Sequence, residues 1–256
     1  MRVLHPVPGA PDHFSDGSAG YAAFRPTYPD ALFDWIGGAA PGRALAWDAG
    51  TGSGQAAVAL ADRFDRVVAT DLSGSQIAHA LPHVDVTYRV APAEQSGLPD
   101  ASVDAVTAAQ ALHWFATDAF YDEVRRVLRP GGLVAAWTYG NAAFATPAVG
   151  ALVDRFYAET VGPDWPPERA HVESGYASLP FPFARVEAPA LAVEAALTLD
   201  GLAGYLRTWS ATARYRATTG VDPVDALVPA LAGVWGDARR AERTRWPLTV
   251  LAGRAG

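Results

Sequence analysis

Short apolar runs alternate with amphipathic stretches through the first 140 residues of the chain. Runs at 44–47, 66–70, 103–109 and 133–139 have the length of strands buried on both faces, and 84–90 alternates like a half-buried strand. Helical patterns occupy 31–36, where Gly37 and Gly38 should end the helix, then 55–64, a short stretch after Ser73, and 118–128. This alternation predicts an α/β fold: a doubly wound, mostly parallel sheet with helices on both faces.

The regular alternation ends near Tyr139. Beyond it we expect a helix at 148–159, a Pro- and aromatic-rich stretch at 162–183, a strand at 185–197, helices at 200–216 and from about 224, and a closing strand at 245–251. We interpret residues 21–256 as one domain, with a core at 40–140 and a helical, aromatic cover at 141–256. Residues 1–20 are rich in Pro, Gly, Asp and Ser and should form a mobile arm.

Glycines alternate with small residues directly after the first predicted strand. Asp48 closes that strand, and Gly50, Gly52 and Gly54 follow. Glycine reaches positive φ and has no Cβ, so a ligand can approach its backbone, and the following helix offers unpaired N–H groups. Asp71 ends the next strand, 71 − 52 = 19 positions after Gly52, where a carboxylate can accept both hydroxyls of a ribose. The pattern predicts a nucleoside-containing cofactor at the carboxyl ends of the strands.

Composition excludes several classes of partner and of catalytic site. The net charge of −7 argues against a nucleic-acid partner, and no apolar run is long enough to span a membrane or serve as a signal peptide, so we expect a cytoplasmic protein. All twenty basic residues are arginine, which excludes a P-loop lysine, a Schiff-base lysine and a Tyr-x-x-x-Lys pair. His79 and His83 are separated by Pro82 and have no evident third ligand, so we expect no metal site.

Two cofactors fit the glycine pattern. Gly52-x-Gly54-x-x-Ala57 satisfies a relaxed dinucleotide fingerprint, with Asp71 placed for the ribose of NAD. The wider pattern resembles class I S-adenosylmethionine-dependent methyltransferases instead, in the order and spacing of Asp48-x-Gly50-x-Gly52-x-Gly54, Asp71, Ala93-Glu94, Leu98-Pro99, Asp104, residues 110–115 and the RVLRPGG turn at 126–132. Because that turn has no counterpart in dehydrogenases, we favour the methyltransferase interpretation.

Three further segments resemble the small-molecule methyltransferases related to trans-aconitate methyltransferase, namely 21–29, 111–115 and 206–210. The resemblance implies a Rossmann-like sheet of seven strands with the last antiparallel, and S-adenosylmethionine as donor, leaving S-adenosylhomocysteine. It implies a small-molecule acceptor, most simply the oxygen of a carboxylate or hydroxyl, with nitrogen or carbon as alternatives, and a monomer or homodimer. A methyltransferase fold kept as a binding or non-methylating scaffold is a further alternative.

The resemblance also implies roles for individual residues around the cofactor. Gly50, Gly52 and Gly54 should line its methionine moiety and Asp48 should help to hold the amino group. The other implied contacts are Asp71 with the ribose, Leu72 with the adenine, Ala93 and Glu94 at the adenine edge, Gln110 at the methionine end, and Tyr21 and Arg25 on a flap that closes over the ligand. Pro92 departs from the pattern, since many relatives carry Asp there to contact the adenine amine.

The acceptor side is predicted from residues that follow the fourth and fifth strands and from the cover. His113 is either a general base or a group that orients the acceptor, the alternative being that it packs beside Trp114. Aromatic residues could wall the acceptor pocket, and Arg207 could hold an anionic acceptor, or could simply lie on a solvated helix face. The aromatic candidates are Trp114, Trp137, Tyr139, Tyr205 and Trp209.

Overall fold

A mostly parallel sheet organises the computed structural model, which describes residues 27–255. Tyr21, Arg25 and the predicted arm at 1–20 therefore lie outside the described residues. The strand order is β3 (Val86–Val90), β2 (Val67–Asp71), β1 (Ala46–Ala49), β4 (Val103–Ala109), β5 (Leu128–Tyr139) and β9 (Glu242–Arg254). The first five strands are parallel and β9 is antiparallel to β5. The predicted α/β fold and the antiparallel last strand are confirmed.

Strand β9 continues past the end of β5 and pairs with further short strands, so the sheet has more strands than the seven expected. Its second half pairs with β5, while Glu242–Pro247 extends past the end of β5. Three further strands pair antiparallel with β9: β6 (Ala143–Phe144), β7 (Ala184–Arg185) and β8 (Ala192–Leu197). The single strand predicted at 185–197 is thus interrupted, and Pro189, which lacks a backbone donor, lies in the gap.

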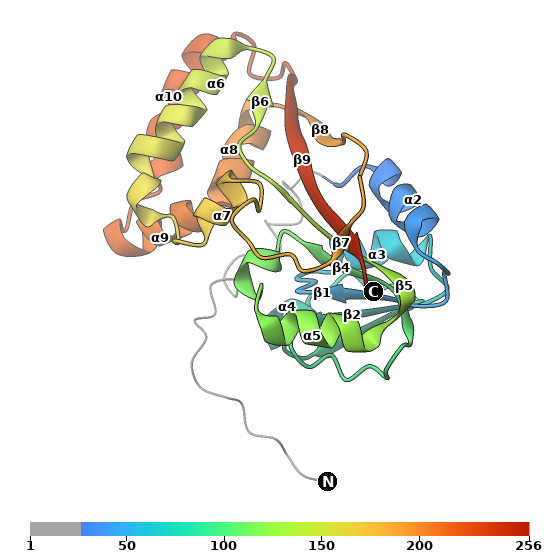
Figure 1. Ribbon diagram of the computed structural model, residues 1–256. Helices are drawn as coiled ribbons and strands as arrows, with labels where there is room; N and C mark the ends of the chain where they lie inside the picture. The colour runs from blue at the N-terminus through green and yellow to red at the C-terminus, as the bar shows by residue number, and fades with distance from the viewer. Residues whose placement is uncertain (1–26, 256) are drawn as a thin grey trace.

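Helices cover both faces of the parallel strands (Figure 1). On one face, α2 (Asp30–Ala39) and α3 (Gln55–Ala61) bury Leu32, Phe33, Ile36 and Leu60. The other face is covered by α5 (Asp118–Val127), while the short α4 (Gly74–Ala78) follows β2. The prediction that Gly37 and Gly38 end the first helix is wrong. Helix α2 continues through them, and the Cβ that Gly37 lacks would lie 3.3 Å from the Arg63 side chain, so glycine there serves close packing.

The remaining helices form a second layer beyond one end of the sheet, which we call the cap (Figure 1). It comprises α6 (Pro147–Arg155), a π-helical turn at Phe156–Thr160, a 3-10 turn at Gly162–Asp164, α7 (Arg169–Glu173), α8 (Leu199–Arg207), α9 (Ser210–Thr219) and α10 (Pro223–Trp235). The cap has its own apolar core, and β9 runs from that core to the sheet. None of the helices between residues 27 and 255 is long and apolar enough to cross a membrane.

The helix predicted over 200–216 is two helices that meet at Trp209. Trp209 has extended backbone angles (φ −69°, ψ 137°) between α8 and α9. Its indole is buried among aromatic rings from three parts of the cap, with centroids 5.5 Å from Trp165, 5.7 Å from Tyr157 and 5.8 Å from Tyr205. The tertiary contacts of one large side chain therefore override a continuous helical pattern.

Candidate active site

Asp48 is buried at the carboxyl end of β1 and joins the glycine loop to β4. One carboxylate oxygen accepts a hydrogen bond from the Thr51 hydroxyl at 2.6 Å, and the other accepts one from the Thr107 hydroxyl at 2.7 Å. Burial raises the pKa of Asp48 to about 6, against these two hydrogen bonds, and the nearby charge of Asp71 raises it further. The carboxylate therefore fixes the loop after β1, and both of its oxygens already have a protein partner.

The three glycines of the loop all have positive φ but differ in what surrounds them. A Cβ on Gly50 would lie 2.8 Å from both the Ala111 methyl group and the Phe115 ring, and one on Gly54 would collide with the Tyr88 phenol. At Gly52 (φ +55°) a Cβ would meet no atom of residues 27–255 within 4 Å. Gly50 and Gly54 thus let neighbouring side chains approach, whereas Gly52 leaves bare backbone beside open space.

Asp71 ties the tip of β2 to this open backbone. Its carboxylate accepts hydrogen bonds from the Gly52 N–H at 2.8 Å and from the Ser73 N–H at 2.9 Å. A carboxylate has about four lone-pair directions, so acceptor capacity remains for two more donors. Leu72, the next residue, is 61% exposed, which is unusual for a large apolar side chain and suits it to pack against a flat ring. The two residues offer complementary polar and apolar contacts at one strand end.

The loop after β3 lies beside Asp71, because the Ala91 N–H donates to the Asp71 carbonyl at 3.0 Å. Within it, Pro92 and Glu94 are exposed. The Ala93 side chain is buried in the apolar core on the α5 side of the sheet, so the contact implied for Ala93 would have to come from its backbone.

Gln110 turns the chain sharply at the end of β4. It is one of the few non-glycine residues with positive φ (+52°), a conformation that costs energy and is often found at functional sites. Three hydrogen bonds to β5 hold it: its N–H donates to the Trp137 carbonyl, its side-chain amide donates to the Tyr139 carbonyl, and its side-chain oxygen accepts from the Thr138 hydroxyl at 2.6 Å. This turn directs residues 111–115 across the strand ends towards the glycine loop.

His113 lies in the 3-10 turn Leu112–Trp114, next to Tyr176. Its Nδ1 is 3.1 Å from the Tyr176 hydroxyl, and the Trp114 ring is 4.9 Å away between centroids. Burial lowers the pKa of His113 to about 4, and the charges of Arg169 and His171 lower it further. The imidazole is therefore neutral near pH 7, and one ring nitrogen can accept a proton. Sequence analysis missed Tyr176, because its Pro- and aromatic-rich segment has no periodic pattern.

Most aromatic candidates for the acceptor pocket lie in apolar cores. Trp137 is fully buried beside Tyr28 and Phe33, and the Tyr205 hydroxyl accepts a hydrogen bond from the Trp246 indole at 3.1 Å. Tyr139 contacts Tyr28 and Trp246, and Trp209 is buried in the cap. Trp114 is the exception at 40% exposed.

Arg207 is held by two carboxylates rather than presented to a ligand. Its Nε lies 3.0 Å from Asp222 and its Nη2 lies 2.7 Å from Asp225. Both partners come from the start of α10, so the guanidinium joins α8 to α10. This pairing accounts for Arg207 without an anionic acceptor.

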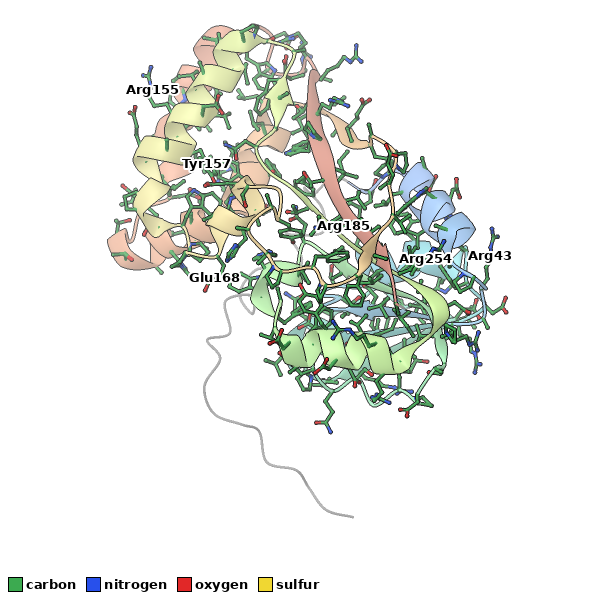
Figure 2. The ribbon with its side chains drawn as sticks, in the orientation of Figure 1. Arg43, Arg155, Tyr157, Glu168, Arg185 and Arg254 are labelled. Carbon is green, nitrogen blue, oxygen red and sulfur yellow. The ribbon has the colours of Figure 1, made fainter. Side chains whose placement is uncertain are left out.

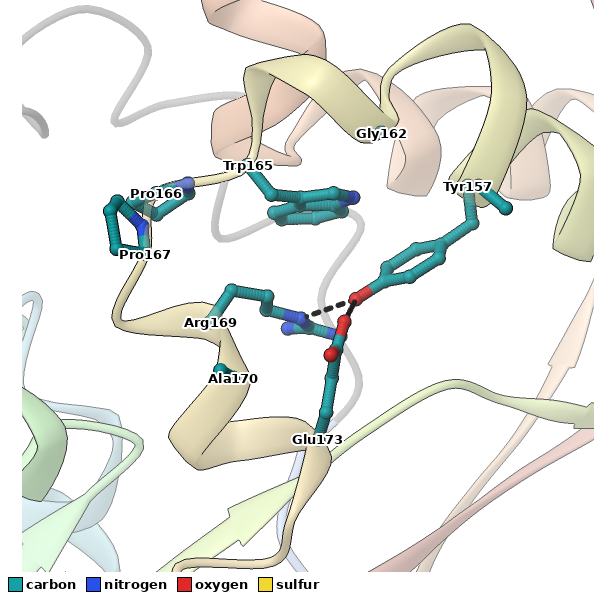
Figure 3. Close-up of a pocket in the computed structure, with 9 residues that line it drawn as sticks. Tyr157, Gly162, Trp165, Pro166, Pro167, Arg169, Ala170 and Glu173 are labelled. Carbon is teal, nitrogen blue, oxygen red and sulfur yellow. Dashed lines mark hydrogen bonds between the residues drawn. The ribbon is translucent and has the colours of Figure 1, made fainter. Parts of the chain in front are cut away.

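A pocket of about 360 Å³ opens in the cap at residues that the sequence did not single out (Figure 3). Tyr157, Trp165, Arg169 and Glu173 line it, together with small residues and prolines. Arg169 also donates from Nη2 to the side-chain oxygen of Asn141 at 3.2 Å, two residues beyond β5. The pocket therefore adjoins the strand ends that carry the other candidate residues.

Comparisons with known proteins agree with this geometry. A family model described as a methyltransferase domain matches residues 47–136. A protein of Dictyostelium discoideum described as a methyltransferase is 36% identical over 207 residues, covering 80% of this chain and 79% of that one. A Mycobacterium tuberculosis protein described as an uncharacterized methyltransferase is 33% identical over 229 residues, covering 86% and 88%. The solved structure of a protein described as a type II methyltransferase from Anaeromyxobacter dehalogenans is 53% identical, with a TM-score of 0.85, covering 91% of this chain and 98% of that one.

Proposed function

Since this chain belongs to the class I S-adenosylmethionine-dependent methyltransferases, we propose that it methylates an oxygen, of a carboxylate or a hydroxyl, on a small diffusible acceptor. The observation that carries the cofactor part of the proposal is the open backbone of Gly52, hydrogen-bonded to the Asp71 carboxylate, with the exposed Leu72 beside it. The net charge of −7 supports a small molecule over a nucleic acid as acceptor, and a cytoplasmic monomer or homodimer fits this function.

The residues at the strand ends fit S-adenosylmethionine, which supplies an electrophilic methyl group on a positively charged sulfur. In this proposal Asp71 accepts the ribose hydroxyls, Leu72 packs on the adenine, and the loop after β3, with Glu94, borders the ring. Gly52 offers its backbone to the methionine moiety, and Asp48 holds the loop in place, bonded through Thr51 and Thr107. The turn at Gln110 borders the same moiety from the β4 side.

The protein contributes mainly alignment to such a transfer. Holding a nucleophile in line with the methyl–sulfur bond can supply about 7–11 kcal/mol of the barrier. A carboxylate acceptor is already ionised and needs no base, whereas a hydroxyl acceptor must lose a proton. His113, neutral and beside the strand ends, is the proposed group that orients the acceptor or takes that proton.

The direct test uses S-adenosylmethionine carrying an isotope-labelled methyl group, incubated with carboxylic acids, phenols, alcohols and amines. We expect labelled methyl esters or ethers, identified by mass spectrometry, and none with Asp71→Ala at the same cofactor concentration. Labelled product from amines alone would replace oxygen with nitrogen as the acceptor. No labelled product from any acceptor, despite tight cofactor binding, would favour a non-methylating scaffold.

His113→Gln separates the two oxygen acceptors. If His113 is the base, turnover of a hydroxyl acceptor should fall by roughly 10²–10⁴-fold, while turnover of a carboxylate acceptor stays within a few-fold. Turnover of both acceptors within a few-fold of the wild type would assign His113 to packing, and an equal large loss for both would make it a group that positions the acceptor.

A further inference from the structure

The cap pocket combines a cation with a buried, unpaired hydrogen-bond donor. Its wall is built by the π-helical turn at Phe156–Thr160, the 3-10 turn at Gly162–Asp164 and the start of α7 (Figure 3). Arg169 and Trp165 both line it. The π-helical turn ends the helix predicted at 148–159, whereas the other two elements come from the Pro- and aromatic-rich stretch, which has no periodic pattern. The pocket is therefore a product of tertiary packing.

Arg169 is fixed in position without being neutralised. Its guanidinium carbon lies 4.6 Å from the centroid of the Trp165 ring and 5.3 Å from that of Tyr157, within the range of cation–π attraction. Its Nε donates to the Tyr157 hydroxyl at 2.8 Å and its Nη2 donates to Asn141. Among residues 27–255, no carboxylate lies within 4 Å of this guanidinium. Since a guanidinium has five N–H donors in a rigid fork, several remain for a ligand.

Glu173, the acidic residue of the pocket, is bonded to a different partner. It is exposed and accepts a hydrogen bond from the Tyr157 hydroxyl, whose oxygen in turn accepts one from Arg169 (Figure 3). Glu173 therefore orients Tyr157 without forming a direct ion pair with Arg169 among the described residues, and the unused N–H groups of Arg169 remain available to a ligand.

Trp165 contributes the unpaired donor. Its indole Nε1 is buried and has no hydrogen-bond partner among the described residues. Figure 3 shows this nitrogen at the Tyr157 end of the ring. An indole N–H can only donate, and leaving such a donor buried and unpaired costs about 1–3 kcal/mol. Because this nitrogen is closed off from solvent, Trp165 contributes to the pocket through the ring on which Arg169 stacks.

The pocket also lies near the proposed reaction site. Arg169 donates a hydrogen bond to Asn141, which follows β5, and the charges of Arg169 and His171 on α7 both lower the pKa of His113. A ligand group bound beside Arg169 is therefore close to the residues that would face the methyl acceptor.

We propose that this pocket binds a carboxylate group of the acceptor that is not itself methylated, through the Arg169 guanidinium held against the Trp165 ring. A carboxylate matches the planar fork of arginine. The pocket would thus select acceptors that carry an acid at a distance from the reacting oxygen. The inference rests on the proposed function only for the claim that the bound molecule is the acceptor.

A binding experiment tests the site independently of catalysis. Protein labelled with ¹⁵N at tryptophan and saturated with S-adenosylhomocysteine is titrated with benzoate, and with benzamide as a neutral ligand of the same shape. The Trp165 indole signal, identified by its loss in Trp165→Phe, reports on binding beside Arg169 and should shift with benzoate and stay in place with benzamide. Absence of any shift with benzoate at tens of millimolar would overturn the proposal.

Two variants of equal charge change provide the matched comparison. Arg169→Gln should weaken benzoate binding by at least ten-fold, and Arg169→Lys, which keeps the charge but not the fork, by less. Arg155→Gln removes an exposed arginine on the outer side of α6 and should leave the affinity unchanged (Figure 2). An equal loss in Arg155→Gln and Arg169→Gln would mean that only the overall charge of the cap matters, and would overturn the specific site.

Methyl transfer then tests whether the bound molecule is the acceptor. With a dicarboxylic acid and its monoamide as acceptors, Arg169→Gln should lower kcat/KM ten-fold or more for the diacid and leave the monoamide nearly unchanged. Equal losses for both acceptors would contradict the selection of a second acid. If the wild type methylates no acceptor but benzoate still shifts the Trp165 signal, the proposed function is wrong and the carboxylate site is supported. If an acceptor is methylated but benzoate causes no shift, the carboxylate site is wrong and the proposed function is unaffected.

Discussion

The parallel sheet and the cap place their functional groups in different ways. In the sheet, the candidate site depends on the backbone: positive φ at three glycines, a carboxylate bonded to the Gly52 N–H, and a left-handed Gln110. In the cap, the pocket depends on side chains from separate turns, with Arg169 stacked on Trp165 and bonded to Tyr157. A cofactor that many enzymes share can be held by conserved backbone geometry, whereas an acceptor specific to one enzyme needs side chains that can vary.

The largest expected effect comes from closing the backbone of the glycine loop. Gly54→Ala places a methyl group against the Tyr88 phenol and forces alanine to a φ of +83°. Left-handed strain of about 1–2 kcal/mol and overpacking of about 1–3 kcal/mol should together lower the free energy of unfolding by about 2–5 kcal/mol. Urea denaturation of the cofactor-free protein measures this loss.

Gly52→Ala is the matched control, because its φ is also positive but no atom of the described part of the chain lies within 4 Å of the new methyl group. Gly52→Ala should lower the free energy of unfolding by the strain alone, about 1–2 kcal/mol. Its loss of binding free energy for S-adenosylmethionine should be larger than this, because the new methyl group occupies the space beside the loop. Equal destabilisation by the two variants would refute the separate roles assigned to these glycines.

The next largest effect is expected in how the free energy of unfolding depends on pH. The folded-state pKa of Asp48 is raised from 3.8 to about 6, so the folded protein takes up this proton first as the pH falls. Between about pH 6 and pH 4, Asp48 should therefore add about 3 kcal/mol to the free energy of unfolding. His113 acts oppositely: its pKa is lowered from 6.5 to about 4, so the stability it contributes above pH 6.5 is lost over the same range.

Asp48→Asn should separate these opposing contributions. The wild-type stability should change little between pH 6.5 and pH 4, whereas the variant should lose stability as the pH falls, since the His113 contribution is then unopposed. Denaturation curves at a series of pH values test this. Parallel profiles for the two proteins would show that Asp48 does not titrate in this range.

Loss of the Asp71 carboxylate should have an intermediate effect, on binding rather than folding. Asp71→Ala removes the charge-assisted hydrogen bonds proposed for the ribose. Loss of even one such bond costs about 1.5–3 kcal/mol, so the affinity for S-adenosylhomocysteine should fall by at least roughly 10–100-fold. The melting temperature of the cofactor-free protein should change far less. Unchanged affinity would remove Asp71 from the site.

The smallest effect is expected in the cap, at Arg207. Its two ion pairs are partly exposed, and each such pair contributes only about 0.2–1 kcal/mol. Arg207→Gln should therefore destabilise the protein by no more than about 2 kcal/mol, as judged by thermal denaturation. An increase in acceptor KM without loss of stability would show instead that Arg207 leaves its carboxylates to bind the acceptor.

The same contrast explains what the sequence could predict. The strands of the parallel sheet, the glycine loop and the position of Asp71 follow from periodicity and glycine spacing, which are local signals. The break at Trp209, the burial of Trp137 and the meeting of Trp165 with Arg169 depend on packing between distant segments, for which a single sequence holds no periodic signal. Tyr176 illustrates the limit: it reaches His113 from 63 positions away.

Calorimetric titration of the purified protein with S-adenosylmethionine, S-adenosylhomocysteine and NAD tests the central claim most directly. The open Gly52 backbone, the Asp71 carboxylate and the exposed Leu72 predict a nucleoside ligand, and the methyltransferase family predicts micromolar binding of the first two ligands with no detectable binding of NAD. Binding of NAD without either of the others would contradict the assignment of this site.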